Sequence, residues 1–157
     1  KIIKKIKKDF NLIIFDCNPS WDTTVDNALG ASNVLLSPMN CSINTYRAMR
    51  VFTKLINDYT KDSTTSTFDI FRVIPTLLRP TKASKFVEGK YRVDYKDICL
   101  SSSIKDATIA ETSNASGKSL IEISSHKENL THDYIQCIKE ISSLIQETEG
   151  EKHARLQ

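Results

Sequence analysis

The chain has 157 residues, of which 39% are hydrophobic and 26% are charged, and its formal net charge is +3. This length and composition are typical of one soluble domain with its own core, and no apolar run approaches the ~20 residues that span a bilayer. The small positive charge does not by itself indicate nucleic-acid binding, so an anion site must be argued from local clusters.

The amino-terminal stretch predicts a helix followed by a strand. Ile2, Ile3 and Ile6 lie among lysines at helical spacing, which indicates the end of an amphipathic helix. A basic tail that binds acidic lipid or nucleic acid is the alternative. The next apolar run predicts a strand over Asn11 to Asp16, which ends on a carboxylate.

The next elements alternate between helix and strand. Residues 23–32 suit a short helix that ends at Gly30, and residues 33–38 form an apolar run stopped by Pro38. Residues 43–59 predict a helix of about four turns, because their apolar side chains fall on one face. Those side chains are Ile43, Tyr46, Met49, Phe52, Leu55 and Ile56.

The second half continues the alternation. After a polar loop over residues 60–67, the sequence predicts a strand at 68–78, a helix at 81–92, a short strand at 97–101 and a final helix at 128–147. Pro75 indicates the end of the 68–78 strand or an edge position. The final helix has one apolar stripe of Leu130, Tyr134, Cys137, Ile138, Ile141, Leu144 and Ile145. Residues 150–157 are expected to form a flexible tail.

Apolar strands that alternate with helices predict an α/β fold, doubly wound, in which a mainly parallel sheet carries helices on both faces. We expect one domain over residues 1–149. Ligands of such sheets bind beyond the carboxyl ends of the strands. Asp16 is predicted at such an end, where a fixed carboxylate can orient a hydrated cation or a water molecule. An Asx turn or a helix cap is the simpler interpretation of the same aspartate.

Other catalytic and metal motifs are missing from these residues. Gly117-Lys118-Ser119 lacks the earlier glycine of a phosphate-binding loop, because position 112 is threonine, and residues 120–123 are expected to be extended. Lys118 is therefore interpreted as a loop lysine. The four cysteines contain no C-x-x-C pair, which argues against zinc and favours reduced thiols. The histidines show no metal-ligand spacing.

A basic cluster is the other candidate site. Arg79, Lys82 and Lys85 follow the 68–78 strand, and Lys105 follows the next strand. Such clusters can hold a phosphate backbone without reading its sequence. A solvated helix start is the alternative.

The order of these pieces resembles the carboxyl-terminal part of ParA/Soj-type partition ATPases, relatives of MinD. The resemblance rests on three stretches, residues 10–56, 72–78 and 104–123. The matching residues are Asp16, Pro19, Ser20, Asn27, Ala28, Leu29, Pro38, Glu111, Gly117 and Lys118. The resemblance spans residues 1 to about 147. It rests on the motifs taken together in their order along the chain, not on any single one.

The resemblance implies a cytoplasmic, nucleoid-associated bacterial ATPase that segregates plasmids or chromosomes. It implies ATP with Mg²⁺ as cofactor, a homodimer in the ATP-bound state, nonspecific DNA and a centromere-binding ParB-type protein as partners, and no membrane. Asp16 would order magnesium-bound water and serve catalysis, Pro19 and Ser20 would belong to the switch loop, and Thr76 would contact the adenine. Arg79, Lys82, Lys85 and Lys105 would contact DNA.

Several positions depart from the family pattern. Asn18 replaces a proline, and Asp22 stands where glycine is common. Ile104 replaces the proline that the family has near the nucleotide base. The amino-terminal third with the Walker A phosphate loop has no counterpart in these residues, so the chain alone is expected to bind no nucleotide and to be inactive as an ATPase.

Two alternatives follow from the residues themselves. One is a non-enzymatic α/β interaction or DNA-binding module. The other is a flavodoxin-like regulator, which would need additional acidic residues at the first strand end.

Overall fold

The computed structural model describes residues 2–62, 68–124 and 129–155, and the side chains of residues 2, 4, 62 and 149–155 lie outside this description. Three predicted features fall partly outside it, namely residues 63–67 of the polar loop, Glu128 at the start of the final helix, and residues 156–157 of the tail. The elements in chain order are α1 (Ile2–Ile6), α2 (Thr23–Ala31), β1 (Val34–Asn40), α3 (Ile43–Asp62), β2 (Ile70–Thr76), α4 (Lys82–Asp94), α5 (Ile109–Ser116), α6 (Leu120–Ile123) and α7 (Asn129–Arg155).

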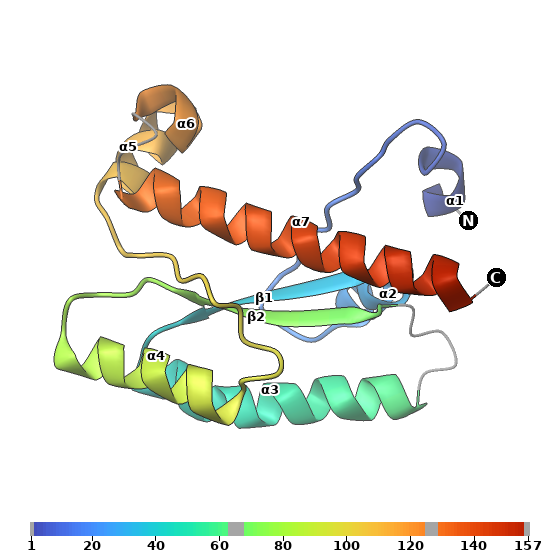
Figure 1. Cartoon of the computed structure of the whole chain (residues 1–157), viewed down its shortest axis with the longest axis horizontal. Helices are drawn as coiled ribbons and strands as arrows, with labels where there is room; N and C mark the ends of the chain where they lie inside the picture. Colours follow the sequence, from blue (N-terminus) through green and yellow to red (C-terminus); the bar gives the residue numbers. More distant parts are fainter. Residues whose placement is uncertain (1, 63–67, 125–128, 156–157) are drawn as a thin grey trace.

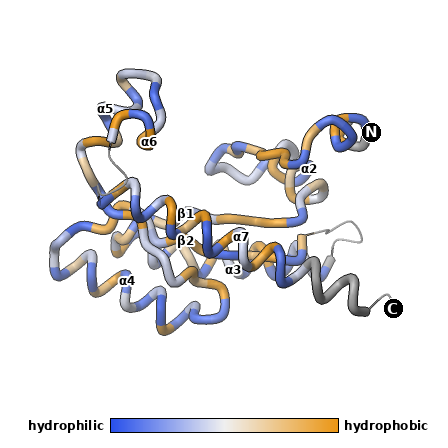
Figure 2. The backbone as a smooth tube through the Cα atoms, turned by 45° about the horizontal axis from the view of Figure 1, so that its top comes forward, coloured by the Kyte–Doolittle hydropathy of each residue, from blue (hydrophilic) through white to orange (hydrophobic). Residues whose placement is uncertain are grey.

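A parallel pair of strands forms the centre of the molecule. β1 pairs with β2 in the register Val34 to Ile70 through Asn40 to Thr76. The other edge of β2 is bonded by residues 98–106, which run parallel to it through bridges at Cys99 and Lys105. β2 therefore lies between two parallel segments, and hydrophobic residues run along both strands (Figure 2).

Helices cover both faces of this sheet, as Figure 1 shows, with α7 on one face and α3 and α4 on the other. The α3–α4 face has a core around Met49, Val73, Val87 and Tyr91, each with no exposed surface. Because side chains alternate along a strand, the neighbour of Val73, Ile74, faces the opposite side.

The core on the α7 face contains Ile74 together with residues from the 98–106 segment and from α7. Its buried members are Ile74, Leu100, Ile104, Leu130 and Cys137. Covering a parallel sheet on both faces is the arrangement expected of an α/β protein. The predicted α/β fold class, with a parallel sheet between helical layers, is confirmed.

Local capping explains where several helices begin and end. Asp22 caps α2 by accepting hydrogen bonds from the backbone N–H groups of Thr24 and Val25 at 2.8 and 3.0 Å. The Thr81 side chain caps α4 in the same way, through the N–H of Ser84. α5 ends at Gly117, whose φ of 64° is the left-handed value that glycine adopts without strain.

The predicted strand over Asn11 to Asp16 is wrong. Residues 12–18 have no regular secondary structure and no bonded neighbour in the described chain, and Leu12 and Ile14 are 71% and 79% exposed. An apolar run forms a strand only where an adjacent strand accepts its backbone hydrogen bonds, and none does so here. Asp16 is therefore not at the end of a strand in this structure.

Pro38 was expected to stop its strand, but β1 continues to Asn40. The Cys41 N–H donates to the Thr76 carbonyl at 2.9 Å, so the odd-numbered residues of β1 direct their backbone groups toward β2. Pro38 faces away from β2, where the proline costs no hydrogen bond of the sheet. Pro75 is the penultimate residue of β2, close to the predicted end.

Three further differences concern the second half of the chain. Residues 97–101 join β2 by an isolated bridge rather than as a regular strand. Residues 120–123 were expected to be extended but form α6, where the Ser119 N–H donates to Glu122 in a capping box. α7 is helical through Arg155, so helix occupies most of the stretch where a flexible tail was expected.

Candidate functional site at the carboxyl edge of the sheet

The carboxyl ends of β1 and β2 lie side by side and are tied together by polar contacts. Thr76 Oγ1 donates to the side-chain oxygen of Asn40 at 3.3 Å. The buried Tyr91 hydroxyl donates to the Asn40 carbonyl at 3.0 Å from α4. Burial is the main cause that raises the pKa of Tyr91, which keeps this hydroxyl protonated as a donor. The predicted position of Thr76 at a strand end is confirmed, although no finding tests its contact with an adenine.

The chain turns sharply after Thr76. Leu77 has a φ of 49°, which is uncommon for a residue with a side chain, and it is 45% exposed. Leu78 then rejoins the sheet, since its N–H donates to the Ile104 carbonyl and its carbonyl accepts from Asp106 N–H. This turn places residue 79 beside the 104–106 segment.

The four basic residues that the sequence singled out come from segments that the structure holds together. Lys105 forms a parallel bridge with Leu78. The Arg79 N–H donates to Ser84 Oγ at 3.0 Å, which fixes the loop against the first turn of α4, where Lys82 also lies. The loop after β2 is therefore bonded both to the start of α4 and to the segment around residue 105, and we call the four cations of these segments the basic edge (Arg79, Lys82, Lys85 and Lys105).

Two of the four cations are already paired with acids. Arg79 Nε lies 2.6 Å from Asp106 Oδ2, and Lys105 Nζ lies 2.7 Å from Asp133 Oδ1 on α7. The Lys105 backbone N–H also donates to Asp133 Oδ2 at 3.1 Å. In the described chain no ion pair reaches Lys82 or Lys85, and both are exposed. The uncompensated positive charge of the basic edge therefore lies at the amino end of α4, where the helix dipole adds to it.

The candidate nucleotide residues of the amino-terminal part are not assembled. Asp16, Pro19 and Ser20 are exposed in an irregular segment, and within the described residues no hydrogen bond or ion pair joins them to Thr76. Magnesium at a nucleotide needs one or two carboxylates together with phosphate oxygens and water. Asp16 offers one carboxylate, and among residues 2–62, 68–124 and 129–155 no cluster of three or more His, Cys, Asp or Glu side chains is suited to a metal.

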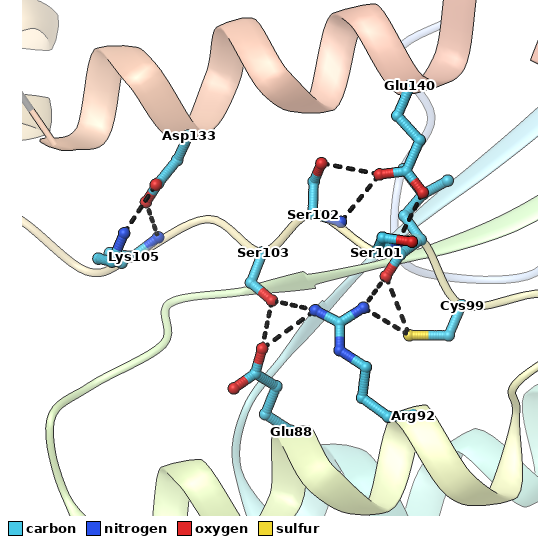
Figure 3. A network of polar contacts seen from close by, with 10 residues as sticks. Glu88, Arg92, Cys99, Ser101, Ser102, Ser103, Lys105, Asp133 and Glu140 are labelled. Atoms are coloured by element: carbon cyan, nitrogen blue, oxygen red, sulfur yellow. Dashed lines mark hydrogen bonds and ion pairs between the residues drawn. The ribbon is translucent and has the colours of Figure 1, made fainter. Parts of the chain in front are cut away.

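A polar network missed at the sequence level joins α7 to the 98–106 segment (Figure 3). Glu140 accepts hydrogen bonds from the N–H groups of Ser101 and Ser102 at 2.6 and 2.8 Å and from the Ser102 hydroxyl at 2.7 Å. Partial burial favours the protonated form of Glu140, but these bonds outweigh it and the pKa is lowered. A run of three serines is the only sequence signal, and it does not identify a partner 38 residues away.

The same segment is also tied to α4. Arg92 donates to the Leu100 carbonyl and, at 2.6 Å, to Ser103 Oγ, while its guanidinium lies 3.1 Å from Glu88 on the same helix. The Ser103 hydroxyl in turn donates to Glu88. Together, Glu140 and Arg92 hold residues 100–103 between the two helical layers, which fixes the segment that carries Lys105.

An open pocket lies elsewhere, among α3, the start of β2 and the end of α4. Asp94, Asp97, Tyr95 and Asn57 are among the residues that line it. None of the predicted site residues does so. The pocket is thus separate from the carboxyl edge.

Comparison with known proteins supports the same interpretation of the fold. Residues 1–70 match a family model described as an AAA domain. A solved structure described as a partition protein matches with a TM-score of 0.54 and 12% identity over 79% of this chain. The chain shares the fold of a partition protein. No curated protein sequence matches it.

The match to this partition protein covers only 32% of that protein's length. At 12% identity the likeness concerns the fold alone. Separately, no helix in the described part of the chain is both long and apolar enough to cross a membrane.

Proposed function

We propose that the chain is part of a ParA-type partition ATPase and that its basic edge binds DNA without sequence preference. The observation that carries the proposal is that hydrogen bonds join the segments of four cations beside the carboxyl edge of the sheet, in a fold shared with a partition protein. Lys82 and Lys85 supply the charge that is free to meet phosphates, whereas Arg79 and Lys105 are partly neutralised by their partners.

In the complete protein, we further propose binding of ATP and Mg²⁺. Asp16 would hold magnesium-bound water for catalysis, Pro19 and Ser20 would form the adjacent switch segment, and Thr76 would lie at the adenine. The AAA-domain match over residues 1–70 supports this assignment, because it includes the segment around Asp16. The phosphate-binding loop would come from outside residues 1–157, so these residues by themselves would not hydrolyse ATP. We also propose that the complete protein forms an ATP-dependent homodimer and binds a ParB-type partner. It would lie on the nucleoid in the cytoplasm.

A non-enzymatic DNA-binding or interaction module is the second candidate. It is favoured by the absence of described contacts between Thr76 and the exposed residues Asp16, Pro19 and Ser20. Calorimetric titration with Mg²⁺-ATP distinguishes the candidates when it is run on the chain and on a longer protein that includes a phosphate loop. Binding only by the longer protein supports the ATPase, and binding by neither supports the module.

Fluorescence anisotropy with two labelled duplexes of unrelated sequence tests the DNA-binding part. We expect the two dissociation constants to agree within about threefold and to lie near 10⁻⁴–10⁻⁶ M, as is usual for nonspecific binding. Both should weaken when salt is raised. Affinity for one duplex only, or affinity independent of salt, contradicts the proposal.

A further inference from the structure

The two paired cations of the basic edge are held by their acids in different ways. Arg79 Nε lies 2.6 Å from Asp106 Oδ2, and the two side chains are 65% and 35% exposed. Lys105 Nζ lies 2.7 Å from Asp133 Oδ1, and the Asp133 side chain is only 8% exposed. An exposed ion pair contributes little to stability, whereas a buried carboxylate that loses its partner is costly. The Arg79 pair can therefore open far more readily than the Lys105 pair.

Asp133 holds Lys105 at two points. The backbone N–H of Lys105 donates to Asp133 Oδ2 at 3.1 Å, and its ammonium group donates to Oδ1. Figure 3 shows Lys105 facing Asp133 on α7. The ammonium group is thus drawn to the α7 layer, whereas Lys82 and Lys85 belong to α4 in the opposite layer.

Arg79 is bonded to the α4 layer instead. Its backbone N–H donates to Ser84 Oγ at 3.0 Å, in the first turn of α4. Lys82 and Lys85 are three residues apart on this helix and are therefore neighbours on its surface. The pair with the acid uses Nε of Arg79, and a guanidinium carries four further N–H groups in a fork that suits a phosphate. Arg79 thus has phosphate donors on the loop that leads into the helix of both lysines.

The loop that carries Arg79 is held by its backbone. Leu77 has a φ of 49°, and a residue with a side chain keeps this conformation only where its surroundings fix it. The Leu78 N–H donates to the Ile104 carbonyl at 3.1 Å, and the Asp106 N–H donates to the Leu78 carbonyl at 3.0 Å. These bonds do not involve the side-chain pair, so the loop stays in place when that pair opens.

We propose that Arg79 exchanges its bond with Asp106 for a DNA phosphate and binds DNA together with the two lysines of α4. Lys105 stays on Asp133 and positions the segment beside β2, and it becomes a DNA contact only when Asp133 is removed. Both roles rest on the proposed function, because they presuppose DNA at the basic edge.

Fluorescence anisotropy with a DNA duplex at several salt concentrations tests these roles. Two double variants each remove one cation and one acid, so the net charge stays the same. Arg79→Gln/Asp106→Asn should make the slope of log affinity against log salt shallower by about 0.9, the value for one phosphate contact. Lys105→Gln/Asp133→Asn is the matched variant and should keep the slope of the unmodified chain. Circular dichroism confirms that each variant folds, and the exposed Arg79 pair decides the proposal even if the other variant unfolds.

Two single variants with equal charge changes give a second readout. Asp133→Asn releases Lys105 as an additional contact, so the affinity should rise and the slope should steepen by about 0.9. Asp106→Asn removes a competitor of the phosphate, so the affinity should rise a few-fold at an unchanged slope. Slopes that respond alike in the two single variants overturn the proposed roles.

The outcomes separate these roles from the proposed function. If the unmodified chain binds DNA in a salt-dependent way, an unchanged slope in the Arg79 double variant overturns the roles alone. A shallower slope in the Lys105 double variant does the same. An unmodified chain without salt-dependent DNA binding overturns both the roles and the proposed function.

Discussion

Lys105 Nζ lies 2.7 Å from Asp133 Oδ1, and the backbone N–H of the same lysine donates to the other carboxylate oxygen. One buried aspartate on α7 thus fixes both the position and the charge of a residue at the basic edge. The pair joins α7 to the segment beside β2. It also reduces the positive charge that Lys105 can present to a polyanion.

Replacing Asp133 should separate its effect on stability from its effect on the charge of Lys105. Asp133→Asn removes the charge that holds Lys105, so the free energy of unfolding should fall by about 1–3 kcal/mol, which denaturant titration measures. DNA affinity should rise a few-fold, because Lys105 is released and one negative charge is lost. Asp58→Asn makes the same charge change on an exposed part of α3 and should alter neither quantity appreciably. An affinity that falls in Asp133→Asn would count against Lys105 as a DNA contact.

Glu140 should make stability depend on pH in the acid range. Its folded pKa lies below the ordinary value of 4.5, so the ionised carboxylate stabilises the fold above 4.5, and this share is lost as pH falls through the folded pKa. Glu140→Gln should lower the free energy of unfolding at neutral pH by about 1 kcal/mol, a figure discounted for solvent exposure. Thermal unfolding from pH 7 down to pH 3 measures both effects. As the pH falls, Glu140→Gln should lose less stability than the unmodified chain. Identical pH profiles would show that the Ser101 and Ser102 contacts do not stabilise the fold.

The hydrogen bond from Tyr91 to the Asn40 carbonyl should contribute to stability. Tyr91→Phe leaves that carbonyl without this donor inside the core, so we expect the free energy of unfolding to fall by about 0.5–1.5 kcal/mol in urea titration. Tyr59→Phe removes a longer bond, 3.4 Å to the Asp26 carbonyl, and should cost less. A larger loss for Tyr59→Phe would reverse this ranking of the two contacts.

The thiols of Cys17, Cys41 and Cys137 should differ in reactivity. Cys17 is exposed, whereas burial raises the pKa of Cys41 to about 11 and also raises that of Cys137. Because the thiolate is the reactive form, maleimide should label Cys17 in the native protein and the two buried thiols only after unfolding. Mass spectrometry after a short labelling time shows which sites have reacted, with Cys17→Ser as the control. Early labelling of Cys41 would mean that the α3–α4 core opens readily.

Sequence patterns correctly predicted several helices and strands from the spacing of their apolar residues. α3 follows the helical spacing of its apolar residues, and β1 and β2 follow short apolar runs. Residues 10–15 carry the same kind of signal, but the structure offers them no neighbouring strand. Similarly, the apolar stripe of α7 contains both Cys137, which is buried, and Ile138, which is exposed. Periodicity indicates which residues favour burial but not whether another element covers them.

The basic edge was partly predictable and the network around Glu140 was not. Arg79, Lys82 and Lys85 are close in sequence, so their clustering could be anticipated, and Lys105 follows from parallel pairing beside β2. Which cations are neutralised depends on contacts across 27 and 28 residues, to Asp106 and Asp133. Such long-range pairs leave no spacing signal in one sequence.

The salt dependence of DNA binding tests the central claim, that Lys82 and Lys85 carry a nonspecific phosphate contact. Anisotropy titrations over a series of salt concentrations give the slope of log affinity against log salt, which changes by about 0.9 for each phosphate contact. The double variant Lys82→Glu/Lys85→Glu should bind more weakly and have a slope shallower by about 2. The charge-matched Lys54→Glu/Lys61→Glu variant of α3 should keep the slope of the unmodified chain. Equal slopes in all three proteins would contradict the account.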